Sequence, residues 1–143
     1  MRLLLDTDTC IFALRRHAKV LDRLLSHRRS DVAVSVITEA ELRTGAAKSS
    51  APAKALLAVE SFLSPLAVLE FDSADAAVYA QVRTRLERAG HPIGALDTLI
   101  AAQAVARRLV VVTSNEREFS RVQGLRLENW ARRGRNASVR IGL

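Results

Sequence analysis

Short apolar runs recur along the chain and alternate with segments of helical periodicity. The runs are RLLL at 2–5, VAVSV at 32–36, LAVLEF at 66–71 and LVVVT at 109–113. Their length and unbroken apolar character favour parallel strands buried on both faces. The helical spacing of apolar residues falls in 9–28, 53–63, 74–89 and 95–107. This alternation predicts an α/β fold with a parallel sheet between layers of helices.

The boundaries between these segments are polar or carry glycine and proline. KSSAPAK at 48–54 and RAGHPIG at 88–94 have the composition of loops. The last stretch, ARRGRNASVRIGL, has no apolar periodicity. With 143 residues in all, we expect one domain over residues 1–131 and a basic tail over 132–143.

The composition supports a folded core and adds a strong positive charge. Hydrophobic residues make up 49% of the chain, while 22 Lys and Arg against 15 Asp and Glu give a net charge of +7. The basic residues are mostly arginine, whose planar fork pairs with phosphate. Nucleic acid and an acidic partner protein both remain open on charge alone, as does a basic protein with neither partner.

Several classes of protein are excluded by what the sequence lacks. Cys10 is the single cysteine, so neither an internal disulfide nor a thiolate metal cluster is possible. Asp6 and Asp8 interrupt the N-terminal apolar run, so we expect no secretory signal. Arg107 and Arg108 split the longest apolar stretch, which leaves no run of roughly 20 residues for a membrane span, and we expect a cytoplasmic location. No zinc-protease, serine-hydrolase or P-loop motif occurs.

Acidic residues follow the strands or begin the helices that come after them. Asp6 directly follows the first strand, and in an open α/β sheet the active crevice lies beyond the carboxyl ends of the strands. Asp8 has an alternative explanation as a helix N-cap. Thr38 and Glu41 form a T-x-x-E pattern, which a capping box would also explain.

Two further segments place oxygen atoms at the same predicted edge. Asp97 falls in the first turn of an apolar helix, where the helix dipole alone would favour a carboxylate. The strand at 109–113 ends in a polar series: Thr113, Ser114, Asn115, Glu116 and Glu118. Each position has an ordinary structural explanation, but together they predict a site of oxygen ligands suited to Mg²⁺ or Mn²⁺. Such an ion polarises a phosphodiester and lowers the pKa of a bound water.

The opening LLLDTDT resembles the first motif of the haloacid dehalogenase phosphatases, in which the first aspartate is a nucleophile. That resemblance also requires a late lysine and a late pair of acids. No lysine follows Lys54 and no aspartate follows Asp97, so we set this interpretation aside.

A second resemblance covers nearly the whole chain. The pieces LLLDTDTCI, SVITEAELRTGAAKS, PIGALDTLIAAQA and LVVVTSNEREFSRVQGLRLENW, in this order and spacing, resemble the PIN-domain ribonucleases, specifically the VapC toxins of bacterial type II toxin–antitoxin pairs. The resemblance implies a PIN-like three-layer fold with a parallel sheet of four to five strands. It also implies divalent metal, expected to be Mg²⁺ with Mn²⁺ as an alternative, and cleavage of RNA such as tRNA or another structured RNA.

The resemblance assigns roles to particular residues. The expected catalytic acids are Asp6, Glu41, Asp97 and Glu118, of which Asp6 and Asp97 contact the metal. The residues expected to support the metal through water or through its ligands are Asp8, Thr113 and Asn115. Many relatives have aspartate at the position of Asn115, and we expect Glu118 to supply the missing charge. The RNA backbone is expected to contact Arg43, Arg117 and Arg121, the arginines nearest the motifs.

The resemblance further implies a homodimer and a VapB-like antitoxin whose peptide blocks the site. Asn115 keeps an alternative open, in which the chain is a catalytically weak PIN-fold module that binds RNA or protein. Aromatic residues are only 4% of the chain, so platforms for base stacking are scarce, and we expect RNA shape to determine specificity.

Overall fold

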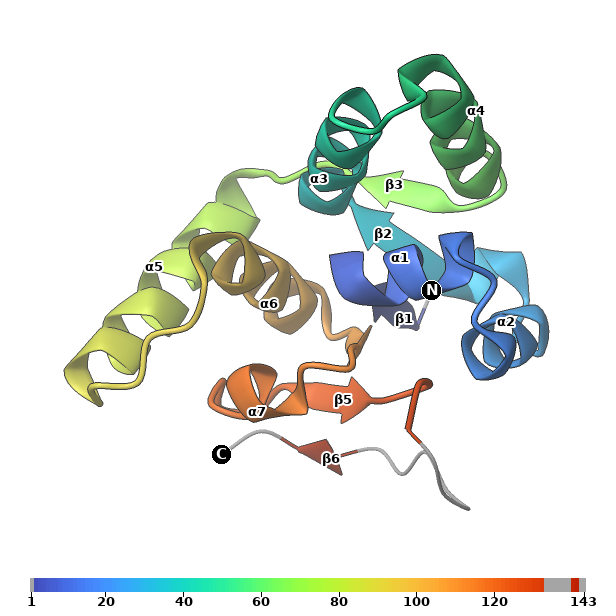
Figure 1. Cartoon of the computed structure of the whole chain (residues 1–143). Helices are drawn as coiled ribbons and strands as arrows, with labels where there is room; N and C mark the ends of the chain where they lie inside the picture. The colour runs from blue at the N-terminus through green and yellow to red at the C-terminus, as the bar shows by residue number, and fades with distance from the viewer. Residues whose placement is uncertain (1, 133–139, 142–143) are drawn as a thin grey trace.

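The computed structural model describes residues 2–132 and 140–141. A six-stranded sheet forms its centre, in the order β3-β2-β1-β4-β5-β6 (Figure 1). The strands are β1 Leu3–Leu5, β2 Val32–Ser35, β3 Ala67–Leu69, β4 Val110–Val112, β5 Arg126–Glu128 and β6 Arg140–Ile141. The first five are parallel, and β6 pairs antiparallel with β5. The predicted parallel sheet of four to five strands is confirmed.

Helices cover both faces of the sheet. They are α1 Thr7–Leu14, α2 Ala18–Leu25, α3 Val36–Ala47, α4 Pro52–Leu63, α5 Ser73–Arg88, α6 Ala95–Arg107 and the short α7 Glu116–Phe119, with one 3-10 turn at Arg29–Asp31. Successive strand residues point to opposite faces, so Leu3 and Leu5 pack with α1 to α4, while Leu4 packs with α5 to α7. The three-layer arrangement is therefore built from unbroken apolar strands, as the sequence predicted.

The strand order places a crevice at one edge of the sheet. Chain order runs outward from β1 to β2 and β3 on one side, and from β4 to β5 on the other. Leu5 pairs in register with both Val34 and Val112, so the carboxyl ends of the three central strands lie level. The order reverses between β1 and β4, and ligands of open α/β sheets bind at such a point.

The helical pattern over residues 9–28 forms two helices rather than one. The chain turns between α1 and α2 at Arg16, which has φ +59°. His17 then caps α2, because its Nδ1 accepts a hydrogen bond of 3.4 Å from the Val20 backbone N–H. No glycine or proline marks this turn, which is why the apolar periodicity predicted a continuous helix.

The predicted domain boundary at residue 131 stays a prediction. Most of the predicted tail at 132–143 lies outside the described residues, although Arg140–Ile141 forms β6 beside β5.

Asp75 anchors α5 to α6 from a buried position. Its carboxylate accepts from Arg107 Nη2 at 2.9 Å and from the Asp72 backbone N–H at 2.9 Å, within a capping box. Burial raises the pKa of Asp75, but these hydrogen bonds and the Arg107 charge outweigh it and lower the pKa below 3.8.

We expect Asp75→Asn to destabilise the fold by about 1–3 kcal/mol at pH 7, because it removes a charged hydrogen-bond partner of Arg107. A carboxyl with a lowered folded pKa stabilises the native state above its unfolded pKa, and this contribution is lost as the pH falls through the folded pKa. The deficit measured by urea unfolding should therefore shrink from pH 7 to pH 3. Glu87→Gln, which alters an exposed pair with Arg83 on the same helix, is the control and should change stability by less than about 1 kcal/mol. An equal deficit for Asp75→Asn at both pH values would contradict the assignment.

Candidate active site

Asp6 lies at the junction of β1 and β4. Its backbone N–H donates to the Val112 carbonyl at 3.0 Å, and its side chain caps α1 by accepting from the Thr9 N–H at 2.8 Å. The residue is only 2% exposed. Burial raises the pKa of Asp6 to about 7, with a smaller contribution from the charge of Asp8, although hydrogen bonds from Thr113 and Thr9 favour the ionised form. A carboxyl in this setting is incompletely ionised near neutrality unless a cation joins it.

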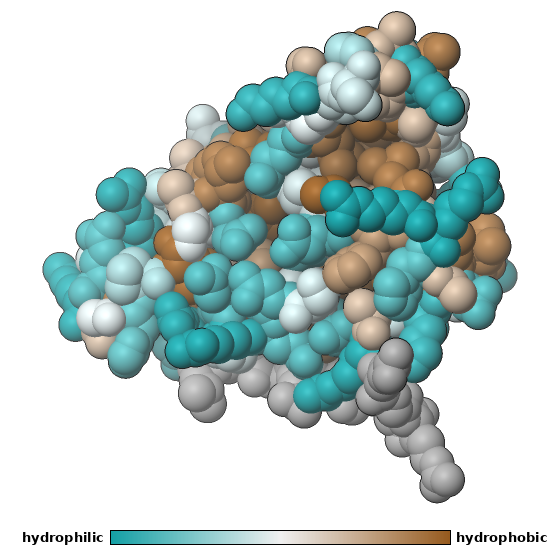
Figure 2. All heavy atoms as spheres, viewed as in Figure 1, coloured by the Kyte–Doolittle hydropathy of each residue, from teal (hydrophilic) through white to brown (hydrophobic). Residues whose placement is uncertain are grey.

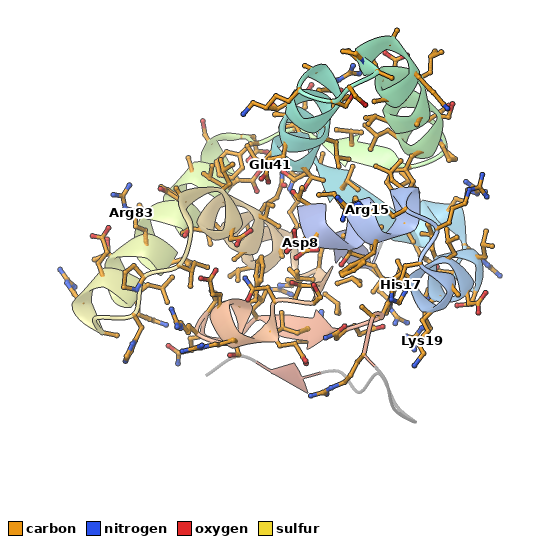
Figure 3. The ribbon with its side chains drawn as sticks, in the orientation of Figure 1. Asp8, Arg15, His17, Lys19, Glu41 and Arg83 are labelled. Atoms are coloured by element: carbon orange, nitrogen blue, oxygen red, sulfur yellow. The ribbon has the colours of Figure 1, made fainter. Side chains whose placement is uncertain are left out.

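Asp8 is not the N-cap of α1. Asp6 occupies that position, and Asp8 falls in the first turn of the helix with an exposed side chain. The alternative explanation of Asp8 as the N-cap is therefore wrong, although Asp8 does lie at the start of the helix as expected. Figure 3 shows Asp8 at the start of α1, on the same face of the molecule as Glu41.

Glu41 is held by two threonines from different helices. The Thr7 hydroxyl donates to Glu41 Oε1 at 2.6 Å and lies 3.1 Å from the Thr38 hydroxyl. A hydroxyl has one proton, and an ionised carboxylate only accepts. The Thr7 hydroxyl therefore donates its hydrogen bond to Glu41, and the Thr38 hydroxyl can donate to the Thr7 oxygen.

The capping box predicted for Thr38 and Glu41 does not form. Helix α3 begins at Val36 and is capped by Ser35, whose hydroxyl accepts from the Ile37 N–H at 3.1 Å. Thr38 is fully buried. The T-x-x-E pattern lies inside the helix, where its spacing puts Thr38 and Glu41 on the face directed at Thr7.

Asp97 lies in the first turn of α6, and its pKa depends on nearby acids. Its pKa is raised to about 6, most strongly by burial and further by the negative charges of Glu118, Glu41 and Asp8. Every charge that acts on Asp97 in the described part of the chain is thus negative. Three acids separated by up to 110 residues in sequence therefore act on one carboxyl at the start of α6.

Glu118 is oriented by Asn115. The Asn115 side-chain amide donates to Glu118 Oε2 at 3.0 Å, and the Asn115 backbone N–H donates to the Thr113 hydroxyl at 2.9 Å. The asparagine therefore holds a neighbouring carboxylate beside Asp97.

From the sequence we expect Glu116, next to Asn115, to point into solvent, and the structure contradicts this. It is 20% exposed, accepts from the Asn129 amide at 3.2 Å and pairs with Arg132 at 3.5 Å. These partners come from the segment after β5, which the local pattern of acids could not reveal.

The three arginines expected to bind RNA differ in their availability. Arg43 pairs with Glu39 at 2.6 Å and with Glu60 at 3.4 Å, and Arg121 donates to the Pro92 carbonyl at 3.0 Å. Arg117 is exposed and makes no side-chain hydrogen bond or ion pair within residues 2–132. Its availability makes it the strongest of the three predicted contacts.

The donor set fits a hard divalent cation in its chemistry. Asp6, Glu41, Asp97 and Glu118 offer only oxygen atoms, and burial raises the pKa of two of them. Among the described residues, no three His, Cys, Asp or Glu side chains are arranged to hold a metal ion as they stand. Mg²⁺ keeps several waters and uses one or two carboxylates. The arrangement therefore fits an ion bound directly by few acids and through water by the others.

The surface around these acids is polar and adjoins an apolar groove. Figure 2 shows hydrophilic residues over the start of α1, and apolar residues between α1 and the α3–α4 pair. Glu41 and Arg15 both line this groove, together with apolar side chains such as Leu42.

The sequence and the fold both match known proteins. The family model of the PIN domain matches residues 3–125. The chain is 42% identical over 130 residues to a protein of Salmonella typhimurium named tRNA(fMet)-specific endonuclease VapC, covering 91% of this chain and 98% of that protein. A protein of the same name from Shigella flexneri is 38% identical and covers 92% and 99% of the two chains.

Solved structures agree with these matches. The crystal structure of DNA-bound VapBC from Salmonella typhimurium contains a chain with a TM-score of 0.87 and 43% identity, covering 91% of this chain and 98% of that one. The corresponding values for VapBC2 from Rickettsia felis bound to a promoter DNA fragment are 0.84 and 35%, with coverage of 91% and 99%.

The chain therefore belongs to the PIN domain family. Within this family it is of the VapC type, and the expectation of a VapC-type ribonuclease is confirmed. None of the helices in the described part of the chain is long and apolar enough to span a membrane.

Thr7 is the site residue that sequence analysis missed, and its role is testable. We expect Thr7→Val to lower kcat for RNA cleavage by about tenfold, which corresponds to roughly 1.4 kcal/mol, because Glu41 loses its oriented donor. Thr7→Ser should retain most of the activity, since it keeps the hydroxyl. Thr44→Val is the control on α3, because its hydroxyl bonds only the Ala40 carbonyl. Wild-type kcat in Thr7→Val would show that Glu41 needs no such support.

Proposed function

We propose that this chain is a Mg²⁺-dependent endoribonuclease toxin that cleaves tRNA or another structured RNA and is neutralised by a VapB-like antitoxin. The observation that carries the metal dependence is the cluster of acids at the β1–β4 edge, in which burial and mutual repulsion raise the pKa of Asp97 and no described cation compensates. The choice of tRNA rests on the names of the Salmonella and Shigella relatives. Cytoplasmic location and a homodimer remain predictions.

Each acid has a role that its surroundings support. Asp6 and Asp97 would contact the metal, because burial makes their charge costly without one. Glu41 and Glu118 are directed by Thr7 and Asn115, so they would hold metal-coordinated or attacking water. A bound Mg²⁺ would supply Lewis-acid activation of water and offset charge on the phosphate oxygens.

The alternative of a catalytically weak binding module rests on Asn115. The Asn115 amide donates a hydrogen bond to Glu118, and the charge of Glu118 raises the pKa of Asp97. A fourth carboxylate is therefore present despite the asparagine, and this favours the enzyme over the binding module.

Cleavage of tRNA in Mg²⁺ and in EDTA tests the proposal. We expect cleavage by the wild type only with metal, and none by Asp97→Asn under either condition. A group whose folded pKa is raised to about 6 destabilises the native state as the pH rises from its unfolded value through 6. In EDTA at pH 8, Asp97→Asn should therefore be more stable than the wild type, by about 1–2 kcal/mol after allowing for solvent screening at this half-buried position.

Metal should reverse this order of stability. Millimolar Mg²⁺ binds the native state and should raise the Tm of the wild type more than that of Asp97→Asn. Cleavage that persists in EDTA would refute the metal requirement. A wild-type chain that binds tRNA but leaves it intact in both Mg²⁺ and Mn²⁺ would favour the binding module.

The Asn115–Glu118 pair can be tested by exchanging its groups. Glu118→Gln should lose most of the activity, because it removes the charge beside Asp97. Adding Asn115→Asp should restore part of it, since the glutamine amide can then donate to the new aspartate across the same 3.0 Å contact. Asn115→Asp alone places two carboxylates against each other and should lower the Tm measured without metal. Full activity in Glu118→Gln would show that three acids suffice.

A further inference from the structure

Three basic side chains, unpaired within the described residues, lie where α1 turns into α2. We call Arg15, Arg16 and Lys19 the cationic corner. All three are exposed, and none of their side chains makes a hydrogen bond or ion pair with the part of the chain that the structure describes. His17, between them, is occupied by capping α2 and by an edge contact with Phe12 at 5.1 Å.

The cationic corner lies on the same face as the acids. Figure 3 shows Asp8 at the start of α1, Arg15 towards its end, and Lys19 beyond it. Arg15 also lines the groove that Glu41 lines. The eight residues of α1 span about 12 Å, so the corner lies a short stretch of nucleic-acid backbone away from Asp6 and Asp8.

Arg16 has the left-handed backbone conformation that ends α1, where its N–H donates to the Ala13 carbonyl at 3.0 Å and the His17 N–H donates to the Phe12 carbonyl at 2.9 Å. Its φ of +59° lies in the left-handed region, which glycine adopts at lower cost. Its guanidinium makes no hydrogen bond or ion pair with a described residue. The end of the helix thus explains the backbone of Arg16, and the exposed side chain stays available to a partner outside the chain.

A second left-handed arginine provides a matched control. Arg108 has φ +57°, is exposed, and its side chain makes no hydrogen bond or ion pair within the described residues. It lies between α6 and β4, at the amino ends of the strands and thus at the edge opposite the acids.

We propose that the cationic corner binds the sugar–phosphate backbone of the RNA substrate beside the acidic site. This inference rests on the proposed function and names a surface that guides the substrate. Arginine and lysine suit phosphate, and the two acids nearest in sequence, Asp8 and Asp22, form no described ion pair with them. A strand held at the corner would have a nearby phosphate directed at Asp6.

The test measures binding of labelled tRNA to the full-length protein in EDTA, across a series of salt concentrations. Arg16→Gly should raise the Kd by about threefold or more and make the salt dependence less steep by roughly 0.7–0.9 for the lost phosphate contact. It should not lower the Tm, because glycine relieves the left-handed backbone. Arg108→Gly should change the Tm in the same direction and leave the Kd unchanged.

A second variant does not depend on the backbone. Arg15→Gln with Lys19→Gln should weaken binding and raise KM for cleavage in Mg²⁺, with little change in kcat. An equal rise in Kd for Arg16→Gly and Arg108→Gly would show that only the total charge of the protein determines tRNA binding. This result would overturn the proposal. An unchanged Kd in both corner variants would also overturn it, even if they bound the antitoxin more weakly, since the corner would then be a protein contact.

These outcomes can be told apart from failure of the proposed function. Absence of cleavage by the wild type would contradict the proposed role of the acids. Binding of tRNA in EDTA tests the cationic corner separately, because it requires neither metal nor cleavage.

Discussion

The burial of Asp6 between β1 and β4 is the constraint on which the rest of the structure depends. Its backbone joins the ladder through Val112, and the Thr9 hydroxyl donates to the same Val112 carbonyl at 2.9 Å. The first helix therefore starts directly from the junction of the two strands. Since the carboxyl ends of these parallel strands lie level, the helices that follow β1, β2 and β4 all begin at this edge of the sheet.

This arrangement has an energetic cost that function explains. A buried carboxyl with a raised pKa and a cluster of acids acting on Asp97 both destabilise the native chain near neutral pH when no cation is bound. Parallel pairing of β1 to β5 and two apolar clusters supply the stability that tolerates this cost. The unfavourable charges are confined to the one edge of the sheet where a ligand can offset them.

Sequence patterns predicted the parts of the molecule that depend on burial. The four predicted strands and the helix at 95–107 follow from apolar runs. The site residues after β1, β2 and β4 lie at one edge because parallel strands end together, whereas Asp97 begins α6, and the action of Glu41 and Glu118 on it is a finding of the structure. The predictions that were wrong concern features that depend on contacts outside the local sequence pattern. The turn at Arg16 has no glycine to signal it, the pattern of Thr38 and Glu41 also fits a cap, and the partners of Glu116 come from beyond β5.

The way each acid is held distinguishes the site from the rest of the surface. Neutral donors orient the carboxylates without cancelling their charge: Thr9 and Thr113 for Asp6, Thr7 for Glu41, and Asn115 for Glu118. Elsewhere arginines neutralise acids directly, as Arg23 does for Glu128 and Arg107 for Asp75. A carboxylate that is oriented but not neutralised keeps its full attraction for a cation, while a paired one has largely used it. Asn115 follows this logic, because an amide at that position fixes Glu118, whereas a second acid would compete with it for the same cation.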